Sequence, residues 1–178
     1  MRVEAWAALA AGLALCGVAR ADVVEALPTG LQVRQTVEIA APADKVWAGL
    51  GRIGAWWNSK HTWSGDARNL TLDLTPGGCL CEALPRGGGA RHLTVVLISP
   101  GKTAILDGTL GPLIFSGGAG HLIWSLAEKD GRTTLTQTYE AGGYLPGGFD
   151  KIAPAVDGVL TDQVRRLKAY VETGKPGG

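Results

Sequence analysis

One apolar stripe with helical spacing ends the chain, and it constrains the fold more than any other feature. The stripe recurs at intervals of three and four residues from Ile152 to Val171, and Gly174 and Pro176 follow it. We therefore expect a helix of roughly 20 residues, about 30 Å long at 1.5 Å per residue. Because only one face of this helix is apolar, a second layer of the fold must cover that face.

Most of the preceding chain alternates between apolar and polar residues, which is typical of half-buried β-strands. Asp130-Gly131 separates two such segments and predicts a hairpin. Pro42 and Asp44 suit the start of a helix, and nearby glycines divide the residues up to Trp57 into short helical pieces. The expected strands cover residues 33–39, 70–74, 79–84, 92–98, 103–110, 121–128 and 133–140. This order predicts an α+β fold in which a curved antiparallel meander of about seven strands wraps the long C-terminal helix, with two short helices after the first strand.

The first segment has the form of a secretory signal peptide. Residues 1–21 contain Arg2, an apolar run from Ala5 to Leu15, and Ala19-Arg20-Ala21, so we expect cleavage after Ala21. The apolar run is too short to cross a bilayer as a helix, so no membrane span is expected after cleavage. The prediction is a periplasmic or secreted protein, with an N-terminal extension at 22–30, one domain at 31–173 and a flexible tail at 174–178.

Composition excludes several classes of protein. With 46% apolar and 19% charged residues, the chain is neither disordered nor collagen-like. A net charge of +1 gives no broad basic field for nucleic acid. Gly101-Lys102-Thr103 lacks the upstream glycine of a P-loop and precedes a strand rather than a helix, so we expect no nucleotide site.

The segment 37–47, with Ala41-Pro42 and Val46-Trp47, resembles the opening of START-like proteins of the SRPBCC superfamily, and Trp56-Trp57 adds to the likeness. This superfamily includes polyketide cyclases/dehydrases and homologues of the heat-shock ATPase activator. The resemblance covers roughly residues 31–173 and implies a helix-grip fold with a hydrophobic pocket between sheet and helix. It implies no single activity, because members bind, transport, cyclise or regulate.

Aromatic residues are the first candidates for such a pocket, since they combine large apolar area with a polar handle. Consecutive helical residues point about 100° apart, so we expect one of Trp56 and Trp57 in the core and the other at the cavity. Trp124 shares a strand face with Leu122 and Leu126, which favours the core. The candidate cavity or rim residues are Trp56, Trp57, His61, Trp63, Trp124, Gln137, Tyr139, Tyr144, Phe149, Ile152, Val156 and Leu160.

Cys79 and Cys81 form a Cys-x-Cys motif. Their Cα atoms would lie about 6.6 Å apart on a regular strand, at the upper limit for a disulfide. A bridge therefore requires local bending, and two buried free thiols remain an equal alternative. A metal site would need further ligands, and no spacing motif links His61, His92 or His121 to the cysteines. We expect no metal and no cofactor.

No catalytic motif stands out, so the leading hypothesis is an exported protein that binds a small apolar or amphipathic molecule. One alternative is an enzyme of cyclase/dehydrase type, in which His92 or His121 pairs with Glu82, Asp107 or Glu140. Such an enzyme should carry a buried histidine or carboxylate with a shifted pKa at its cavity. A second alternative is an interaction module whose cavity is filled and whose apolar patch is exposed.

Overall fold

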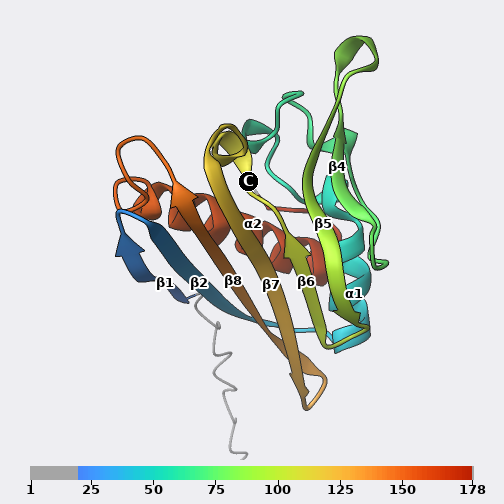
Figure 1. Ribbon diagram of the computed structural model, residues 1–178. Coiled ribbons are helices and arrows are strands. Elements are labelled where there is room, and N and C mark those ends of the chain that lie inside the picture. The colour runs from blue at the N-terminus through green and yellow to red at the C-terminus, as the bar shows by residue number, and fades with distance from the viewer. Residues whose placement is uncertain (1–19, 178) are drawn as a thin grey trace, which may run out of the picture.

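A computed structural model describes residues 20–177 and shows one antiparallel sheet curved around a long helix (Figure 1). The strands lie in the order β1-β2-β8-β7-β6-β5-β4-β3, so the predicted meander is confirmed from β3 to β8. The strands are β1 Arg20–Leu27, β2 Gly30–Ile39, β3 Leu70–Leu72, β4 Cys79–Ala83, β5 Gly89–Ser99, β6 Thr103–Asp107, β7 Gly117–Lys129 and β8 Arg132–Tyr144. The helices are α1 Ala43–Gly51 and α2 Ala153–Thr173, with 3-10 turns η1 Ile53–Ala55, η2 Ser59–His61, η3 Ala67–Asn69, η4 Pro85–Gly87 and η5 Gly111–Phe115.

The sheet has eight strands rather than about seven because residues expected to form an N-terminal extension belong to β1. This strand pairs with β2 through the turn at Pro28 and Thr29. Its side chains from Asp22 to Leu27 are exposed, so the apolar residues there give no burial pattern to recognise. The expected signal peptide lies outside the described residues except for the backbone of Arg20 and Ala21, which is part of β1.

The C-terminal helix has the extent that the stripe predicted. Pro154 lies in its first turn, and Gly174 ends it with a left-handed φ of 80° that a glycine adopts without strain. Leu160, Val164 and Leu167 are buried against the sheet, chiefly against β2. The helix crosses the concave face of the sheet in Figure 1, and this packing forms the main core.

The short helical region after β2 differs in detail from the sequence prediction. Only α1 is an α-helix, and the second piece is the 3-10 turn η1. A Cβ atom on Gly49 would lie 2.7 Å from Cγ2 of Val171, so glycine allows α1 to pack closely on α2. This contact fixes the start of the loop that carries Trp56, Trp57 and η2.

A polar network crosses the core between the sheet and α2. Nε1 of Trp124 donates to Oε1 of Gln137 at 2.8 Å, and Nε2 of Gln137 donates to Oε1 of Gln35 at 3.0 Å. Nε2 of Gln35 in turn donates to Oδ1 of Asp157 on α2 at 2.7 Å. Because each buried amide has partners, the network fixes the helix relative to β2, β7 and β8.

None of the helices within residues 20–177 combines the length and the apolar character needed to cross a membrane.

Candidate functional site

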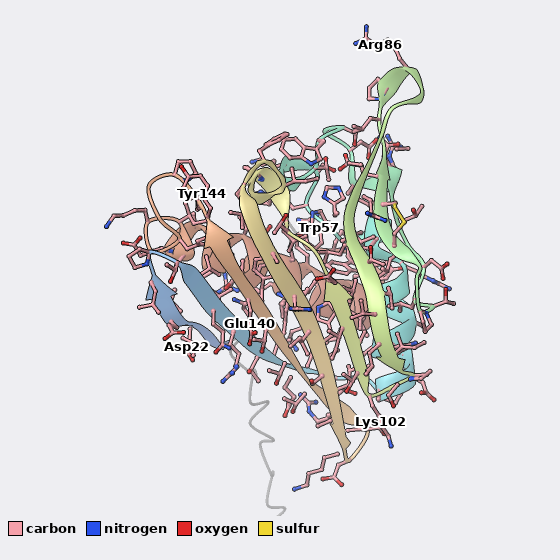
Figure 2. The ribbon with its side chains drawn as sticks, in the orientation of Figure 1. Asp22, Trp57, Arg86, Lys102, Glu140 and Tyr144 are labelled. Carbon is pink, nitrogen blue, oxygen red and sulfur yellow. A yellow bond between two sulfur atoms is a disulfide. The ribbon has the colours of Figure 1, made fainter. Side chains whose placement is uncertain are left out.

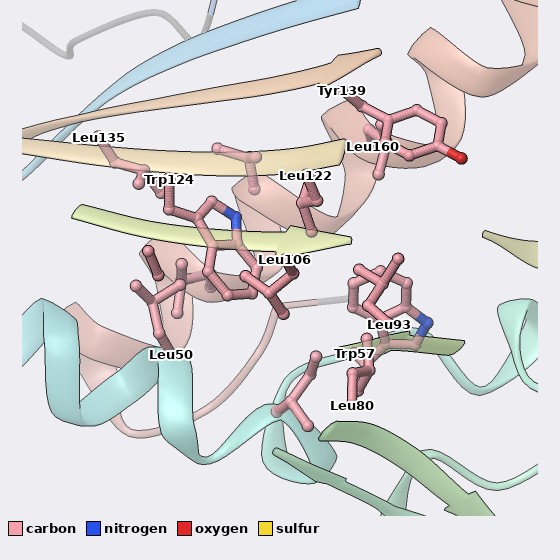
Figure 3. Packing of buried hydrophobic residues seen from close by; sticks show 14 of the residues in the cluster. Leu50, Trp57, Leu80, Leu93, Leu106, Leu122, Trp124, Leu135, Tyr139 and Leu160 are labelled. Atoms are coloured by element: carbon pink, nitrogen blue, oxygen red, sulfur yellow. The ribbon is translucent and has the colours of Figure 1, made fainter. Parts of the chain in front are cut away.

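A cavity of about 480 Å³ lies between the sheet and the N-terminal half of α2. Figure 3 shows part of its surroundings, with Tyr139 and Leu160 on one side and Trp57 and Leu80 on the other. The lining residues are Trp57, Lys60, His61, Thr62, Trp63, Leu70, Leu80, His92, Leu110, Gly111, Pro112, Leu113, Tyr139, Leu145, Ile152, Ala155, Val156, Val159 and Leu160. The walls are therefore mostly apolar, and the polar lining residues are the consecutive Lys60, His61 and Thr62 together with His92 and Tyr139.

The helix supplies one wall through a single face. Ile152, Val156 and Leu160 are spaced by four residues, so they lie above one another on the side of α2 that faces the cavity. Leu160 is buried, whereas Ile152 and Val156 are only partly covered. From its N-terminus to its C-terminus, the stripe therefore changes from cavity wall to core packing.

The two neighbouring tryptophans occupy different environments. Trp56 is buried in the core, and its Nε1 donates to the backbone oxygen of Gly49 at 2.8 Å. Trp57 lines the cavity, and its Nε1 donates to the backbone oxygen of His61 at 3.0 Å. This second bond holds η2 at the rim. Trp63, further along the same loop, also lines the cavity and is 42% exposed.

Tyr139 brings a hydroxyl group into the apolar lining from β8. Its oxygen accepts the backbone N–H of Leu110 at 3.0 Å. Burial raises the pKa of Tyr139 to about 12, although the hydrogen bond from Leu110 opposes this shift. The phenol consequently keeps its proton at neutral pH, and it can donate that proton to a carbonyl or hydroxyl oxygen in the cavity.

His92 and Glu82 form a buried pair beside the cavity. Nε2 of His92 lies 2.9 Å from Oε2 of Glu82, and both side chains are almost fully buried. The same carboxylate accepts the backbone N–H groups of Ser64 at 2.5 Å and Trp63 at 3.2 Å. Burial alone would raise the pKa of Glu82, but the hydrogen bonds from Ser64, Trp63 and His92 outweigh it and hold the pKa below its ordinary value.

Ionised Glu82 also determines which nitrogen of His92 carries the proton. A carboxylate only accepts hydrogen bonds, so Nε2–H donates to it and Nδ1 of a neutral ring keeps its lone pair. His92 itself lines the cavity, whereas Glu82 lies behind it. A histidine oriented by a carboxylate is an arrangement suited to proton transfer.

The structure does not bring all predicted site residues to this cavity. Tyr144 lies at the end of β8, five positions after Tyr139, so strand alternation turns it outward and leaves it 72% exposed. Trp124 and Gln137 belong to the core network, and Phe149, in the loop before α2, is buried in the core. Together with Trp56, these residues lie outside the cavity lining.

Other lining residues gave little signal in the sequence. The sequence offers His92 only as an acid/base candidate without a position, and the strand alternation that buries Leu80 between two cysteines is the signal that indicates a wall position. The loop at residues 110–113 and Ala155 carry no motif, and Val159 belongs to the apolar stripe, which does not separate cavity from core positions. The lining residues outside the predicted set are Lys60, Thr62, Leu70, Leu80, His92, Leu110, Gly111, Pro112, Leu113, Leu145, Ala155 and Val159.

Cys79 and Cys81 are joined in the structure by a disulfide on β4. Their Cα atoms lie 5.4 Å apart, closer than on a regular strand, and the register with β5 shifts between Leu80 and Cys81. The irregularity supplies the bending that such a short bridge needs. Within residues 20–177, no group of three or more histidine, cysteine or acidic side chains is arranged to hold a metal ion.

The remaining predicted acid/base candidates lie on the outer face of the sheet. Nε2 of His121 lies 3.6 Å from Oδ1 of Asp107, and both side chains are about half exposed. Glu140 accepts a hydrogen bond from Nε2 of Gln32. None of these three ionisable residues lines the cavity described above.

Solved structures with the same fold support this description. The chain aligns with DynU16, a putative protein in the dynemicin biosynthetic locus, with a TM-score of 0.57 and 24% identity over 82% of this chain. It spans about half of DynU16, 48% of that chain. A conserved protein of unknown function from Enterococcus faecalis gives a TM-score of 0.59 and 16% identity over 92% of this chain and 81% of the other.

CalU16 from Micromonospora echinospora gives a TM-score of 0.52 and 15% identity over 90% of this chain and 86% of that chain. At these identities, the three likenesses show the fold alone. No curated protein matches the chain. Residues 31–172 match the family described as polyketide cyclase/dehydrase and lipid transport. Since this match covers nearly the whole described domain, the chain belongs to the polyketide cyclase/dehydrase and lipid-transport family of the SRPBCC superfamily.

Proposed function

We propose that the protein binds a small, largely apolar molecule in the cavity between the sheet and α2. The observation that carries this proposal is the cavity of about 480 Å³ with walls from Leu70, Leu80, Val156 and Leu160. Ligand pockets commonly measure about 300–1,000 Å³ and combine apolar walls with a few polar groups. The hydroxyl of Tyr139 and the ring of His92 are two such groups away from the rim.

Filling the cavity is expected to abolish this binding. Val156→Trp places an indole in the space, so the affinity for the neutral fluorophore N-phenyl-1-naphthylamine should fall at least about tenfold. Val159→Trp, from the same helix, should act in the same way. Val96→Trp is the matched control, because Val96 is exposed on β5 outside the lining. Unchanged fluorophore titrations in both helix variants, with folding checked by circular dichroism, would contradict the proposal.

The proposal includes export, which rests on the sequence of residues 1–21. Expression of the full chain in a Gram-negative host and intact-mass analysis of the periplasmic fraction test it. The expected product begins at Asp22, and a product that keeps Met1 in the cytosol would contradict export. Native mass spectrometry of the same sample would show whether an apolar passenger is bound.

The pairing of His92 with Glu82 favours a second candidate function, an enzyme of cyclase/dehydrase type. Nδ1 of His92 would accept a proton from the carbon next to a ketone, and the resulting enolate oxygen would accept a hydrogen bond from Tyr139. The enolate can then attack a second carbonyl of the same molecule, and the alkoxide so formed takes the proton back from His92. Loss of the new hydroxyl group together with a hydrogen from the adjacent carbon would then release water and leave a carbon–carbon double bond.

Hydrogen exchange measures the first step of this second function alone. The protein should accelerate deuterium incorporation from D₂O into 2-tetralone, a compact apolar ketone, and His92→Gln should remove at least about 90% of the acceleration. His121→Gln is the control, because His121 also faces a carboxylate but lies outside the cavity. Equal exchange rates in the unaltered protein and in His92→Gln would eliminate this candidate.

A further inference from the structure

Two basic residues stand at the rim of the cavity on a firmly held turn. Lys60 and His61 belong to η2, line the cavity and are exposed, so they lie where the cavity meets solvent. Nδ2 of Asn58 donates to Oδ2 of Asp162 at 2.7 Å, and the backbone N–H of Asn58 donates to Oε1 of Gln163 at 2.9 Å. The turn is thus fixed to α2 on one side and to Trp57 on the other.

The lining has an uneven charge distribution. Its ionisable members besides Tyr139 are Lys60, His61 and His92, and no aspartate or glutamate is among the lining residues that the structure describes. The ammonium group of Lys60 forms no ion pair within residues 20–177, although its backbone N–H donates to Oδ1 of Asn58. The carboxylate of Asp162 accepts from the neutral amide of Asn58 and lies outside the lining, so it keeps its charge but forms no ion pair with Lys60. The rim therefore presents to a bound molecule a positive charge that no carboxylate of the described lining offsets.

Apolar groups begin directly inside and beside this rim. Trp63 lines the cavity, and its ring meets that of Phe115 edge to face, with centroids 5.6 Å apart. Leu70, Leu80 and Leu160 lie further inside and are buried. A molecule that is complementary both to the basic rim and to the apolar interior of the cavity has an apolar body and a negative group at one end.

We propose that the cavity selects amphipathic anions, whose apolar body is enclosed while a carboxylate or similarly compact anion lies at the rim beside Lys60. This inference rests on the proposed binding function and adds the chemical class of the ligand. His92 is buried and already donates to Glu82, so the rim, where water still solvates the charge, is the favourable place for an anion.

The expected selectivity is moderate because Lys60 is exposed. Ion pairs at such sites are screened by water and salt, and they change affinity by about two- to fivefold. Dodecanoate should therefore bind more tightly than dodecyltrimethylammonium, which has the same chain and the opposite charge. Dodecanol, with no charge, should lie between them. Displacement of N-phenyl-1-naphthylamine at pH 8 and low salt, below the micelle concentrations, gives the three affinities.

Charge reversal at Lys60 sharpens the test. Lys60→Glu should weaken dodecanoate about five- to tenfold, strengthen dodecyltrimethylammonium and leave dodecanol unchanged, and high salt should reduce these differences. Lys102→Glu is the matched control, since it makes the same charge change at the β5–β6 turn. Lys102 lies outside the cavity lining, and Figure 2 shows it at the opposite end of the molecule from Tyr144 and Arg86.

The outcomes separate the ligand class from the binding function itself. If all three compounds bind equally and Lys60→Glu changes none of them, the selection of anions is overturned while binding in the cavity stands. If Lys102→Glu has the same effect as Lys60→Glu, the effect is a general consequence of net charge and the rim proposal is overturned. If neither the fluorophore nor any of the three compounds binds, the proposed function fails as well.

Discussion

Glu82→Ala is expected to lower the free energy of unfolding by about 3–4 kcal/mol, because it removes a buried carboxylate that three donors share. Within the described residues, Nε2 of His92 and the backbone N–H groups of Trp63 and Ser64 all donate to this carboxylate. The buried Nε2–H of His92 would keep its full desolvation penalty, and the part-buried N–H groups of Trp63 and Ser64 would keep a share of theirs. Glu82→Gln retains one acceptor oxygen and similar volume, so it should lose only about half as much.

Urea denaturation at pH 7 measures these losses. Asp107→Ala is the matched control, because Asp107 also faces a histidine but is 53% exposed, and its removal should change stability by less than about 0.5 kcal/mol. A loss for Glu82→Ala no larger than the loss for Asp107→Ala would show that the buried cluster does not hold the loop that carries Trp63.

The pH dependence follows from the lowered pKa of Glu82. In the folded protein, the hydrogen bonds from Ser64, Trp63 and His92 hold this pKa below the unfolded value of about 4.3. The stabilisation by the ionised carboxylate is therefore complete above pH of about 4.3, and it is lost as the pH falls toward the folded pKa. The stability difference between the unaltered protein and Glu82→Gln should shrink in that acidic window, which urea denaturation at a series of pH values measures.

Much of the fold could be predicted because its periodicities are strong. The stripe from Ile152 to Val171 predicted the length of α2, and Asp130-Gly131 predicted the hairpin that β7 and β8 form. The strand β1 could not be predicted in this way, because its side chains are exposed and burial imposes no alternation on them. Local patterns therefore predict elements that bury one face, and they miss an edge strand that buries almost nothing.

The site was less predictable, since it depends on contacts between distant segments. Glu82 and His92 are ten residues apart on neighbouring strands, and the register slip after Leu80 places Glu82 opposite Ala90 and leaves His92 without a partner in the ladder, which strand alternation alone does not predict. Tyr139 and Gln137 share a strand face, yet only Tyr139 reaches the cavity because Gln137 is held by Trp124 and Gln35. Sequence indicates which face a residue occupies, whereas the position of the cavity along that face depends on how α2 lies across the sheet.

Trp124→Ala is expected to have the largest effect on stability, a loss of about 4 kcal/mol. The indole is fully buried between the sheet and α2 and is among the largest fully buried side chains. Its removal leaves a void that the surrounding leucines fill only in part. It also removes the indole N–H that donates to Oε1 of Gln137, and Gln137 in turn connects β8 to β2 through Gln35.

Two further variants separate these contributions. Trp124→Phe keeps most of the apolar volume but leaves Oε1 of Gln137 without its indole donor, so it should lose about 2 kcal/mol. Trp63→Ala removes a tryptophan side chain that lies at the cavity rim and is 42% exposed, so it should lower the free energy of unfolding by about 1 kcal/mol or less. Urea denaturation gives all three values, and Trp63→Ala should in addition weaken N-phenyl-1-naphthylamine binding. If Trp124→Ala and Trp63→Ala lose equal stability, the core would not lie where β7, β8 and α2 meet, and the division between core and cavity derived above would fail.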